Sequence, residues 1–189
     1  MNAKTNIINL QNGTYSFKLT VKNDIYSNSD TVNVTLLQNT KTISLALKKG
    51  WNLISINVIP NNASTSSILP NSSLIKSNDG YFKSGQPSVF NSINEIVAGV
   101  GYLVYNAIDE TISITGTEMQ SIVYLHTGWN LVGVPIQSNF TVTSLPTQTI
   151  IVKDFDGFYE KGNTMSTISE LQVGKAYYIK VSDNCEINW

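Results

Sequence analysis

Apolar and polar residues alternate near the start of the chain with a period of two, which is typical of half-buried β-strands. Apolar side chains occupy every second position over residues 15–21 and 32–36, and a polar stretch over residues 23–30 separates the two runs. The pattern predicts a β-hairpin with one apolar face. Because two strands alone are marginally stable, we expect this face to be covered by another part of the chain, by sequence outside it, by a partner, or by a second copy of the chain through self-association.

An internal repeat organises the rest of the chain. Residues 47–54 (LKKGWNLI) align with residues 125–132 (LHTGWNLV) at a separation of 78 residues, and matches continue at separations of 77 and 75 residues to the ends of both copies. The falling separation corresponds to insertions in the first copy that are small enough to lie in loops. We therefore predict an N-terminal hairpin unit over residues 1–40 and two homologous lobes over residues 43–117 and 121–189.

Each copy contains short patterns typical of strands. We predict a hairpin at the start of the first copy. Apolar and polar residues alternate over residues 43–47, a turn follows at residues 48–50, and an apolar run covers residues 51–58. Ser55 and Gly133 occupy matching positions of the two copies. Small residues within strands favour a close approach of two backbones, and we expect this approach inside each lobe.

The dipeptides Asp79-Gly80 and Asp156-Gly157 lie between apolar runs at matching positions of the two copies. Asp-Gly between strands is typical of a type I′ turn, in which the glycine has a positive φ. We therefore predict a further hairpin around each dipeptide.

Two segments resemble capped helical turns. Residues 92–96 and 167–171 begin with Ser or Thr, and Glu95 and Glu170 follow three residues later. A hydroxyl residue followed by Glu at this spacing is typical of a capping box at a helix N-terminus. We predict one short helical turn at this place in each lobe.

Composition supports an all-β fold. The chain of 189 residues contains 22 Asn, 21 Ser and 18 Thr, but only six Ala and no Arg. Ala and Arg favour helices, whereas the 36 Ile and Val residues and nine Tyr residues suit the pleated surface of a sheet. The predicted fold class is all-β: an N-terminal hairpin, resembling the remnant of a sandwich, plus two small, mainly antiparallel lobes.

Charge and residue types argue against several classes of function. A net charge of -1 without Arg argues against a nucleic-acid partner, because phosphate binding needs clustered basic residues. One histidine (His126) and one cysteine (Cys185) cannot build a zinc site or an intrachain disulfide. No apolar run reaches the ~18 residues of a membrane span. We also expect no cofactor and no enzymatic activity, since no catalytic motif is present.

The candidate ligand-binding residues are aromatic. Trp51 and Trp129 occupy the same position of the two copies, either as platforms for sugar rings or as anchors of the two cores. Two aromatic pairs follow the Asp-Gly dipeptides: Tyr81, Phe82, Phe158 and Tyr159. Because consecutive residues of a strand point to opposite faces, we expect one residue of each pair to face solvent and a ligand.

Three carboxylates lie close together in the second copy. Asp154, Asp156 and Glu160 fall within seven residues, and carboxylate oxygens are the ligands that Ca²⁺ takes. The first copy has Ser77 and Asp79 at the matching places and no counterpart of the Glu. The segment is a candidate Ca²⁺ site or, as the alternative, an acidic turn without a metal.

The N-terminal segment resembles part of a known domain type. Residues 12–21 (NGTYSFKLTV) and 29–35 (SDTVNVT) resemble the last two strands of PKD-type, immunoglobulin-like domains, so that residues 1–37 correspond to the C-terminal part of one. The resemblance implies an extracellular β-sandwich that serves as a spacer or binding module. The earlier strands of such a domain are absent from the sequence.

The two copies resemble a repeat of bacterial and archaeal surface proteins. Its first motif corresponds to residues 50–55 (GWNLIS) and 128–131 (GWNL), and its second to residues 99–102 (GVGY) and 174–177 (GKAY). This chain lacks the Pro that precedes the second motif in that family and the Trp that follows its Tyr. The repeat carries no catalytic motif and implies a secreted or cell-surface location.

Together these features predict a non-catalytic, extracellular or cell-surface module of a larger secreted prokaryotic protein. The predicted role is that of a structural spacer or adhesion domain. The alternative is a carbohydrate-binding module that uses exposed aromatic residues and is accessory to a polysaccharide-degrading enzyme. The expected partners are a polysaccharide or another cell-surface component and the other domains of the parent chain. The polar segment after Met1 lacks the apolar stretch of a signal peptide, so we expect an excised part of a longer chain.

Overall fold

The computed structural model describes residues 7, 10, 13–37, 39–119 and 122–189. Strands dominate the described residues, and helical structure among them is confined to α1 (Thr65–Ile68) and the 3-10 turns η1 (Ser88–Phe90) and η2 (Val142–Ser144). The all-β prediction is confirmed. The chain divides into two compact units, Met1–Asn39 and Thr40–Trp189, which are described separately.

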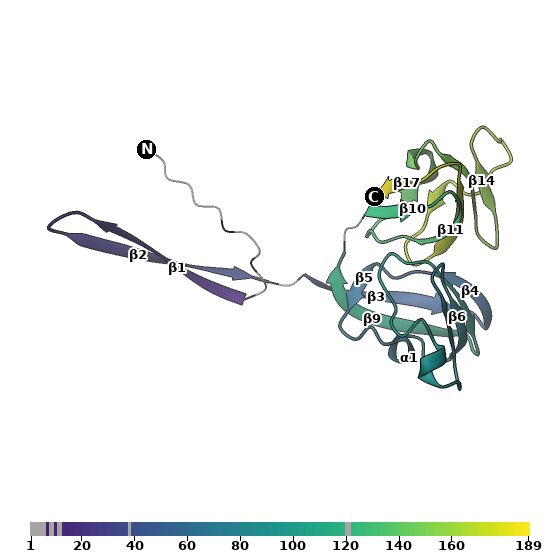
Figure 1. Cartoon of the computed structure of the whole chain (residues 1–189), viewed down its shortest axis with the longest axis horizontal. Coiled ribbons are helices and arrows are strands. Elements are labelled where there is room, and N and C mark those ends of the chain that lie inside the picture. Colours follow the sequence, from purple (N-terminus) through teal and green to yellow (C-terminus); the bar gives the residue numbers. More distant parts are fainter. Residues whose placement is uncertain (1–6, 8–9, 11–12, 38, 120–121) are drawn as a thin grey trace. The chain divides into compact units, whose positions relative to one another are not determined.

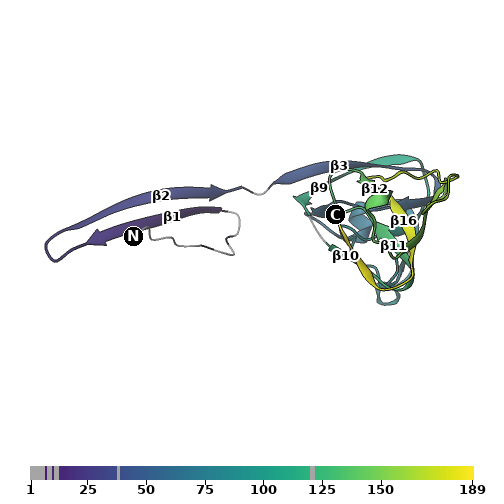
Figure 2. The ribbon, with the colours of Figure 1, turned by 90° about the horizontal axis from the view of Figure 1, so that it is seen from above.

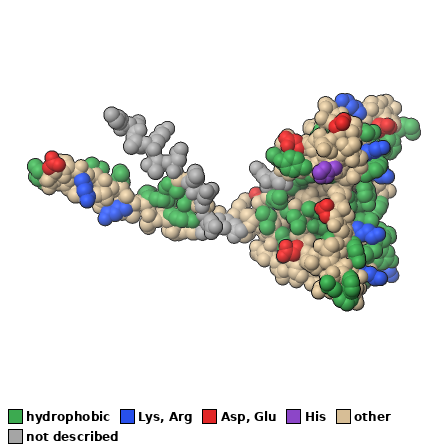
Figure 3. Space-filling model, viewed as in Figure 1, with side chains coloured by type: hydrophobic (Ala, Val, Ile, Leu, Met, Phe, Trp, Pro, Cys, Tyr) green, Lys and Arg blue, Asp and Glu red, His purple; other side chains and the backbone are tan. Residues whose placement is uncertain are grey.

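The first unit is a long antiparallel hairpin. Strand β1 (Gly13–Lys22) pairs with β2 (Ser27–Leu36) in continuous register. Asn23 shapes the turn, because its Oδ1 accepts hydrogen bonds from the backbone N–H groups of Ile25 (3.0 Å) and Tyr26 (2.6 Å). Asn12, with which the PKD-like resemblance begins, lies outside the described residues. Apolar side chains remain exposed along the hairpin (Figure 3), among them Leu19, Val21, Val32 and Val34.

The second unit begins with a lobe that we call the first lobe (residues 40–119). Its strands are β3 (Thr40–Leu47), β4 (Gly50–Ile54), β5 (Val58–Pro60), β6 (Ser72–Lys76), β7 (Tyr81–Lys83), β8 (Tyr102–Asn106) and β9 (Glu110–Glu118). They form a four-stranded sheet of order β4-β8-β6-β7 and a three-stranded sheet of order β3-β9-β5. Figures 1 and 2 show the strands of the two sheets. Both sheets contribute to one apolar core, which contains Leu47, Ile75, Val104 and Ile114.

The second lobe (residues 122–189) has a matching arrangement. Its strands are β10 (Ile122–Leu125), β11 (Gly128–Gly133), β12 (Phe140–Thr141), β13 (Thr149–Lys153), β14 (Phe158–Glu160), β15 (Glu170–Leu171), β16 (Ala176–Val181) and β17 (Cys185–Asn188). The four-stranded sheet has the order β11-β16-β13-β14, and β10 pairs with β17 as β3 pairs with β9. Leu125, Val152, Ile179 and Ile187 belong to its separate core.

The hairpin predicted over residues 43–58 does not form. Strand β3 pairs with β9 and strand β4 pairs with β8, so the chain passes from one sheet to the other at residues 48–50. Asn52 stabilises this corner: its Oδ1 accepts from the Lys48 N–H (2.8 Å), and its Nδ2 donates to the Lys48 carbonyl (2.8 Å). Gly50, at a φ of 101°, adopts a conformation open mainly to glycine.

The helical turns predicted from Glu95 and Glu170 are also wrong. Glu95 forms an isolated antiparallel bridge with Ser64, and Glu170 lies in β15. The hydroxyls that resemble helix caps have other roles, since Ser92 Oγ accepts from the Tyr81 N–H (2.9 Å) and Thr167 Oγ1 from the Phe158 N–H (3.2 Å). The helical turns lie elsewhere, at α1 and η1 in the first lobe and at η2 in the second.

The hairpins predicted around the Asp-Gly dipeptides are present as β6–β7 and β13–β14. The type I′ turns predicted from these dipeptides are wrong, because neither Gly80 nor Gly157 has a positive φ. A Cβ atom at Gly80 would overlap the Ser92 hydroxyl, and one at Gly157 would overlap the Thr167 hydroxyl. Glycine is therefore required here by close packing and not by backbone conformation.

Candidate ligand-binding site

The two lobes meet through equivalent backbone segments. Ile54 of the first lobe forms an antiparallel bridge with Lys175 of the second, and Val132 of the second forms one with Val100 of the first. Ile54 and Val132 occupy one repeat position, and Val100 and Lys175 occupy another. Each lobe therefore offers the same two segments to the other, as in an isologous dimer interface.

Ser55 and Gly133 lie at this junction, and the close approach expected inside each lobe occurs between the lobes. The Ser55 N–H donates to the Gly174 carbonyl (3.0 Å), and the Gly133 N–H donates to the Gly99 carbonyl (3.1 Å). Ser55 Oγ adds a bond to the carbonyl of Lys175 (2.8 Å). The junction is thus a network of backbone hydrogen bonds around two small residues.

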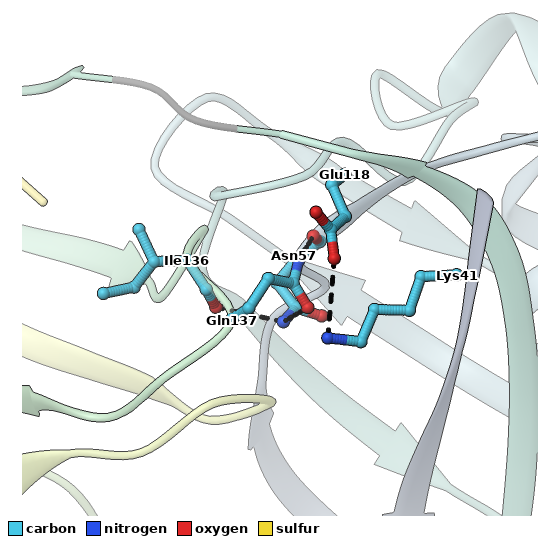
Figure 4. Close-up of polar contacts among 5 residues, drawn as sticks. All are labelled: Lys41, Asn57, Glu118, Ile136 and Gln137. Atoms are coloured by element: carbon cyan, nitrogen blue, oxygen red, sulfur yellow. Dashed lines mark hydrogen bonds and ion pairs between the residues drawn. The ribbon is translucent and has the colours of Figure 1, made fainter. Parts of the chain in front are cut away.

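A second polar contact joins the lobes near the end of β9 (Figure 4). Asn57 Nδ2 donates to the Ile136 carbonyl (3.0 Å) and to Gln137 Oε1 (3.1 Å), while Gln137 Nε2 donates to the Asn57 carbonyl (2.7 Å). The ion pair of Lys41 and Glu118 (3.6 Å) lies beside it. Buried hydrogen bonds of this kind fix the relative position of the lobes, because breaking them leaves buried polar groups unpaired.

A groove of about 470 Å³ lies between the lobes. Residues of β3 and β4 form one wall, and the turn between β13 and β14 together with residues 173–176 forms the other. The side chains most relevant to binding are Lys48, Trp51, Leu53, Asp154, Phe155 and Lys175. Aromatic side chains beside both charges and a backbone edge suit a polar, ring-shaped ligand.

Trp51 and Trp129 lie outside the apolar cores. Their exposed fractions are 44% and 48%. The Trp51 ring contacts Tyr105 edge to face at a centroid distance of 5.2 Å, whereas Lys153 Nζ lies 4.5 Å from the centroid of the Trp129 ring. The two tryptophans therefore differ: a cation lies over Trp129, and Trp51 lines the groove.

The two aromatic pairs are divided between core and surface. Phe82 packs against the core of the first lobe and Tyr159 against that of the second. Tyr81 is exposed and Phe158 is partly buried. The described residues that line the groove include none of these four, although the turn that precedes β14 forms part of its wall.

The three candidate Ca²⁺ ligands are not brought together. Asp154 Oδ1 accepts from the backbone N–H groups of Asp156 and Gly157, both at 2.8 Å, and so closes the turn. Glu160 Oε2 instead accepts from Asn163 Nδ2 (2.8 Å). Among the described residues, no three Asp, Glu, His or Cys side chains are grouped so that they could hold a metal ion. Asp154 and Asp156 line the groove.

Tyr102 and Tyr177 are buried tyrosines at matching positions. Burial raises the pKa of both hydroxyls, and the charges of Asp79 and Asp154 respectively raise it further. Each hydroxyl accepts a backbone hydrogen bond at 2.9 Å, from Val97 and Gln172 respectively. These groups stay neutral and hold the loops that precede β8 and β16.

No protein-family model, curated protein or solved structure matches this chain. Within the described part of the chain, no helix is both long and apolar enough to cross a membrane. The site must therefore be interpreted from its own residues. Trp51, Asp154 and Asp156 are candidate site residues from the sequence that line the groove. Leu53, Phe155 and Lys175 are not predicted, because they line a site only once the lobes meet. The one available signal was the mismatch of Asn78 with Phe155 in an otherwise regular repeat.

Proposed function

We propose that this chain is a non-catalytic, extracellular or cell-surface module of a larger secreted protein, and that it adheres to polysaccharide through the groove between the lobes. The exposure of Trp51 at the groove is the observation that carries the proposal. Contiguous exposed apolar surface bordered by polar groups is typical of an interaction site, and both Trp51 and Phe155 are exposed at this groove.

The chemistry of the groove supports a saccharide. The apolar C–H face of a sugar ring packs well against an indole ring. Lys48 and Lys175 supply hydrogen-bond donors, and Asp156 supplies an acceptor for sugar hydroxyls.

Trp51→Ala tests the proposal. We expect the substitution to weaken binding to polysaccharide by at least about tenfold, because it removes the stacking surface. Binding is measured by co-sedimentation with insoluble polysaccharides and by fluorescence titration with soluble ones. Trp129→Ala is the matched control and should bind like the wild type. If the wild-type chain binds none of a broad panel of polysaccharides, the proposal is wrong.

A spacer role is the second candidate, and the separate hairpin unit favours it. The resemblance of this unit to PKD-type domains supports a place between other domains of a parent chain. Its exposed apolar residues, such as Leu19 and Val32, also favour pairing with a second copy.

Sedimentation equilibrium tests self-association through the hairpin. We expect a monomer–dimer equilibrium at concentrations of roughly 0.1–1 mM, typical of weak contacts, because burial of the exposed apolar residues stabilises the pair. The double variant Leu19→Lys/Val32→Lys should shift the equilibrium to the monomer. A strict monomer for the wild type at these concentrations would contradict self-association.

A further inference from the structure

The two lobes differ where the β6–β7 and β13–β14 turns face the junction. In the first lobe the turn residue is Asn78, whose Oδ1 accepts from the Leu131 N–H (2.8 Å) and whose Nδ2 donates to the Leu131 carbonyl (3.1 Å). One carboxamide thus pairs with both backbone groups of a strand residue in the other lobe. The equivalent residue of the second lobe is Phe155, and the equivalent of Leu131 is Leu53.

Strand geometry places the Leu53 N–H on the edge of β4 that faces the second lobe, and Leu53 is among the residues that line the groove. Alternate residues of a strand direct their N–H groups to the same edge, and the Ser55 N–H crosses the junction to Gly174. Leu53 therefore presents its N–H on that edge, as Leu131 does toward Asn78. Phe155 has no acceptor atom, and no side chain of the described residues accepts this hydrogen bond. The groove thus combines a backbone donor with the ring of Trp51.

We propose that the groove binds the acetamido group of an N-acetylated amino sugar. The amide of the ligand contacts Leu53 as the Asn78 carboxamide contacts Leu131. The carbonyl oxygen of the ligand's amide accepts a hydrogen bond from the Leu53 N–H. The sugar ring then stacks on Trp51. This inference rests on the function proposed above and names the class of sugar.

An extended peptide fits the groove less well. A peptide strand needs several free backbone groups along an edge, but Ile54 is bridged to Lys175 and Ser55 is bonded to Gly174. These contacts leave only the start of the short strand β4 accessible. A ligand with a single amide group therefore fits the one accessible strand residue, Leu53, better than a peptide does.

Titration with two trisaccharides tests the inference. Wild-type protein is titrated with the β-1,4-linked trimers of N-acetylglucosamine and of glucose, which differ in the acetamido groups. We expect the acetylated trimer to bind at least about tenfold more tightly, which is the effect of one well-placed hydrogen bond. Equal binding of the two trimers at Trp51 would overturn the inference and leave the proposed function intact. Binding of neither trimer would overturn the inference, whereas the proposed function is decided by the broad panel of polysaccharides.

Phe155→Asn provides a second test. The new carboxamide should pair with Leu53 as Asn78 pairs with Leu131 and exclude the acetylated trimer, lowering its affinity by at least about tenfold. Phe155→Leu is the matched control and should retain affinity. Thermal unfolding should be unchanged in both, because Phe155 is 56% exposed. Wild-type affinity in Phe155→Asn, or equal loss in both variants, would overturn the assignment of the acetamido contact to Leu53.

Discussion

Replacing Gly133 with alanine is expected to lower the free energy of unfolding by about 3 kcal/mol or more, because overpacking against backbone is costly. A Cβ atom at Gly133 would lie 2.5 Å from the Ser55 Cβ, 2.8 Å from the Val100 oxygen and 2.9 Å from the Gly99 oxygen. Two of these three atoms belong to the backbone of the first lobe, so no side-chain rotation relieves the overlap. The lobes must move apart, and the Gly133–Gly99 hydrogen bond is then lost.

Urea unfolding followed by circular dichroism measures this effect. Gly162→Ala is the comparison variant, since Gly162 has a φ of 80° and open space around it. Its expected cost is only about 1–2 kcal/mol, the strain of a left-handed conformation. We also expect Gly133→Ala to make unfolding less cooperative, because the two cores are separate and the junction couples them. A cost for Gly133→Ala no larger than that for Gly162→Ala would contradict the packing of the lobes described above.

Asn130→Ala is expected to lower the free energy of unfolding by about 2–4 kcal/mol, since it leaves buried backbone groups unpaired. Asn130 is the counterpart of Asn52 and is 5% exposed. Its Oδ1 accepts from the His126 N–H (2.9 Å), and its Nδ2 donates to the carbonyls of His126 (2.7 Å) and Gly128 (3.2 Å). Alanine removes these bonds, and a longer one to the Ile179 carbonyl (3.5 Å), at the corner where the chain passes from β10 to β11.

Chemical denaturation of two further variants tests whether the loss of stability is specific to Asn130 or follows from removing any asparagine side chain. Asn188→Ala removes one exposed bond to Glu186 (3.3 Å) and should change stability by less than about 0.5 kcal/mol. Asn130→Asp places a buried carboxylate oxygen beside the carbonyl of His126, which Asn130 Nδ2 contacts at 2.7 Å, so its cost should be at least as large as that of Asn130→Ala. Equal costs for Asn130→Ala and Asn188→Ala would show that the side chain does not stabilise the corner.

The sequence predicts strands better than it predicts their partners. Alternation over residues 43–47 correctly indicates a strand. However, the sequence pattern of strand, turn and strand is the same whether the two strands pair with each other or belong to different sheets. The hydrogen bonds of Asn52 decide between these outcomes. The Ser92 and Thr167 hydroxyls resemble helix caps in the sequence, yet they bind strand residues that only the fold brings near.

The candidate site is harder to predict than the fold because it belongs to neither lobe alone. Trp51 is recognisable from the repeat, although its exposure is not. Ser55 and Gly133 indicate a close backbone approach, but the repeat cannot show whether it occurs within or between lobes. The sequence shows that Asn78 is replaced by Phe155 in the second copy. Only the structure shows that Asn78 binds Leu131 of the other lobe and that Phe155 lies in the groove with Leu53.

The most direct test of binding between the lobes is a ¹H–¹⁵N spectrum of the full chain during titration with the N-acetylglucosamine trimer. We predict that the signals of the Leu53 amide and the Trp51 indole N–H shift as the trimer is added. The Leu131 amide, which is already bonded to Asn78, and the Trp129 indole N–H should not shift. Shifts confined to Trp129 and Leu131, or an unchanged Leu53 amide at saturation, would contradict it.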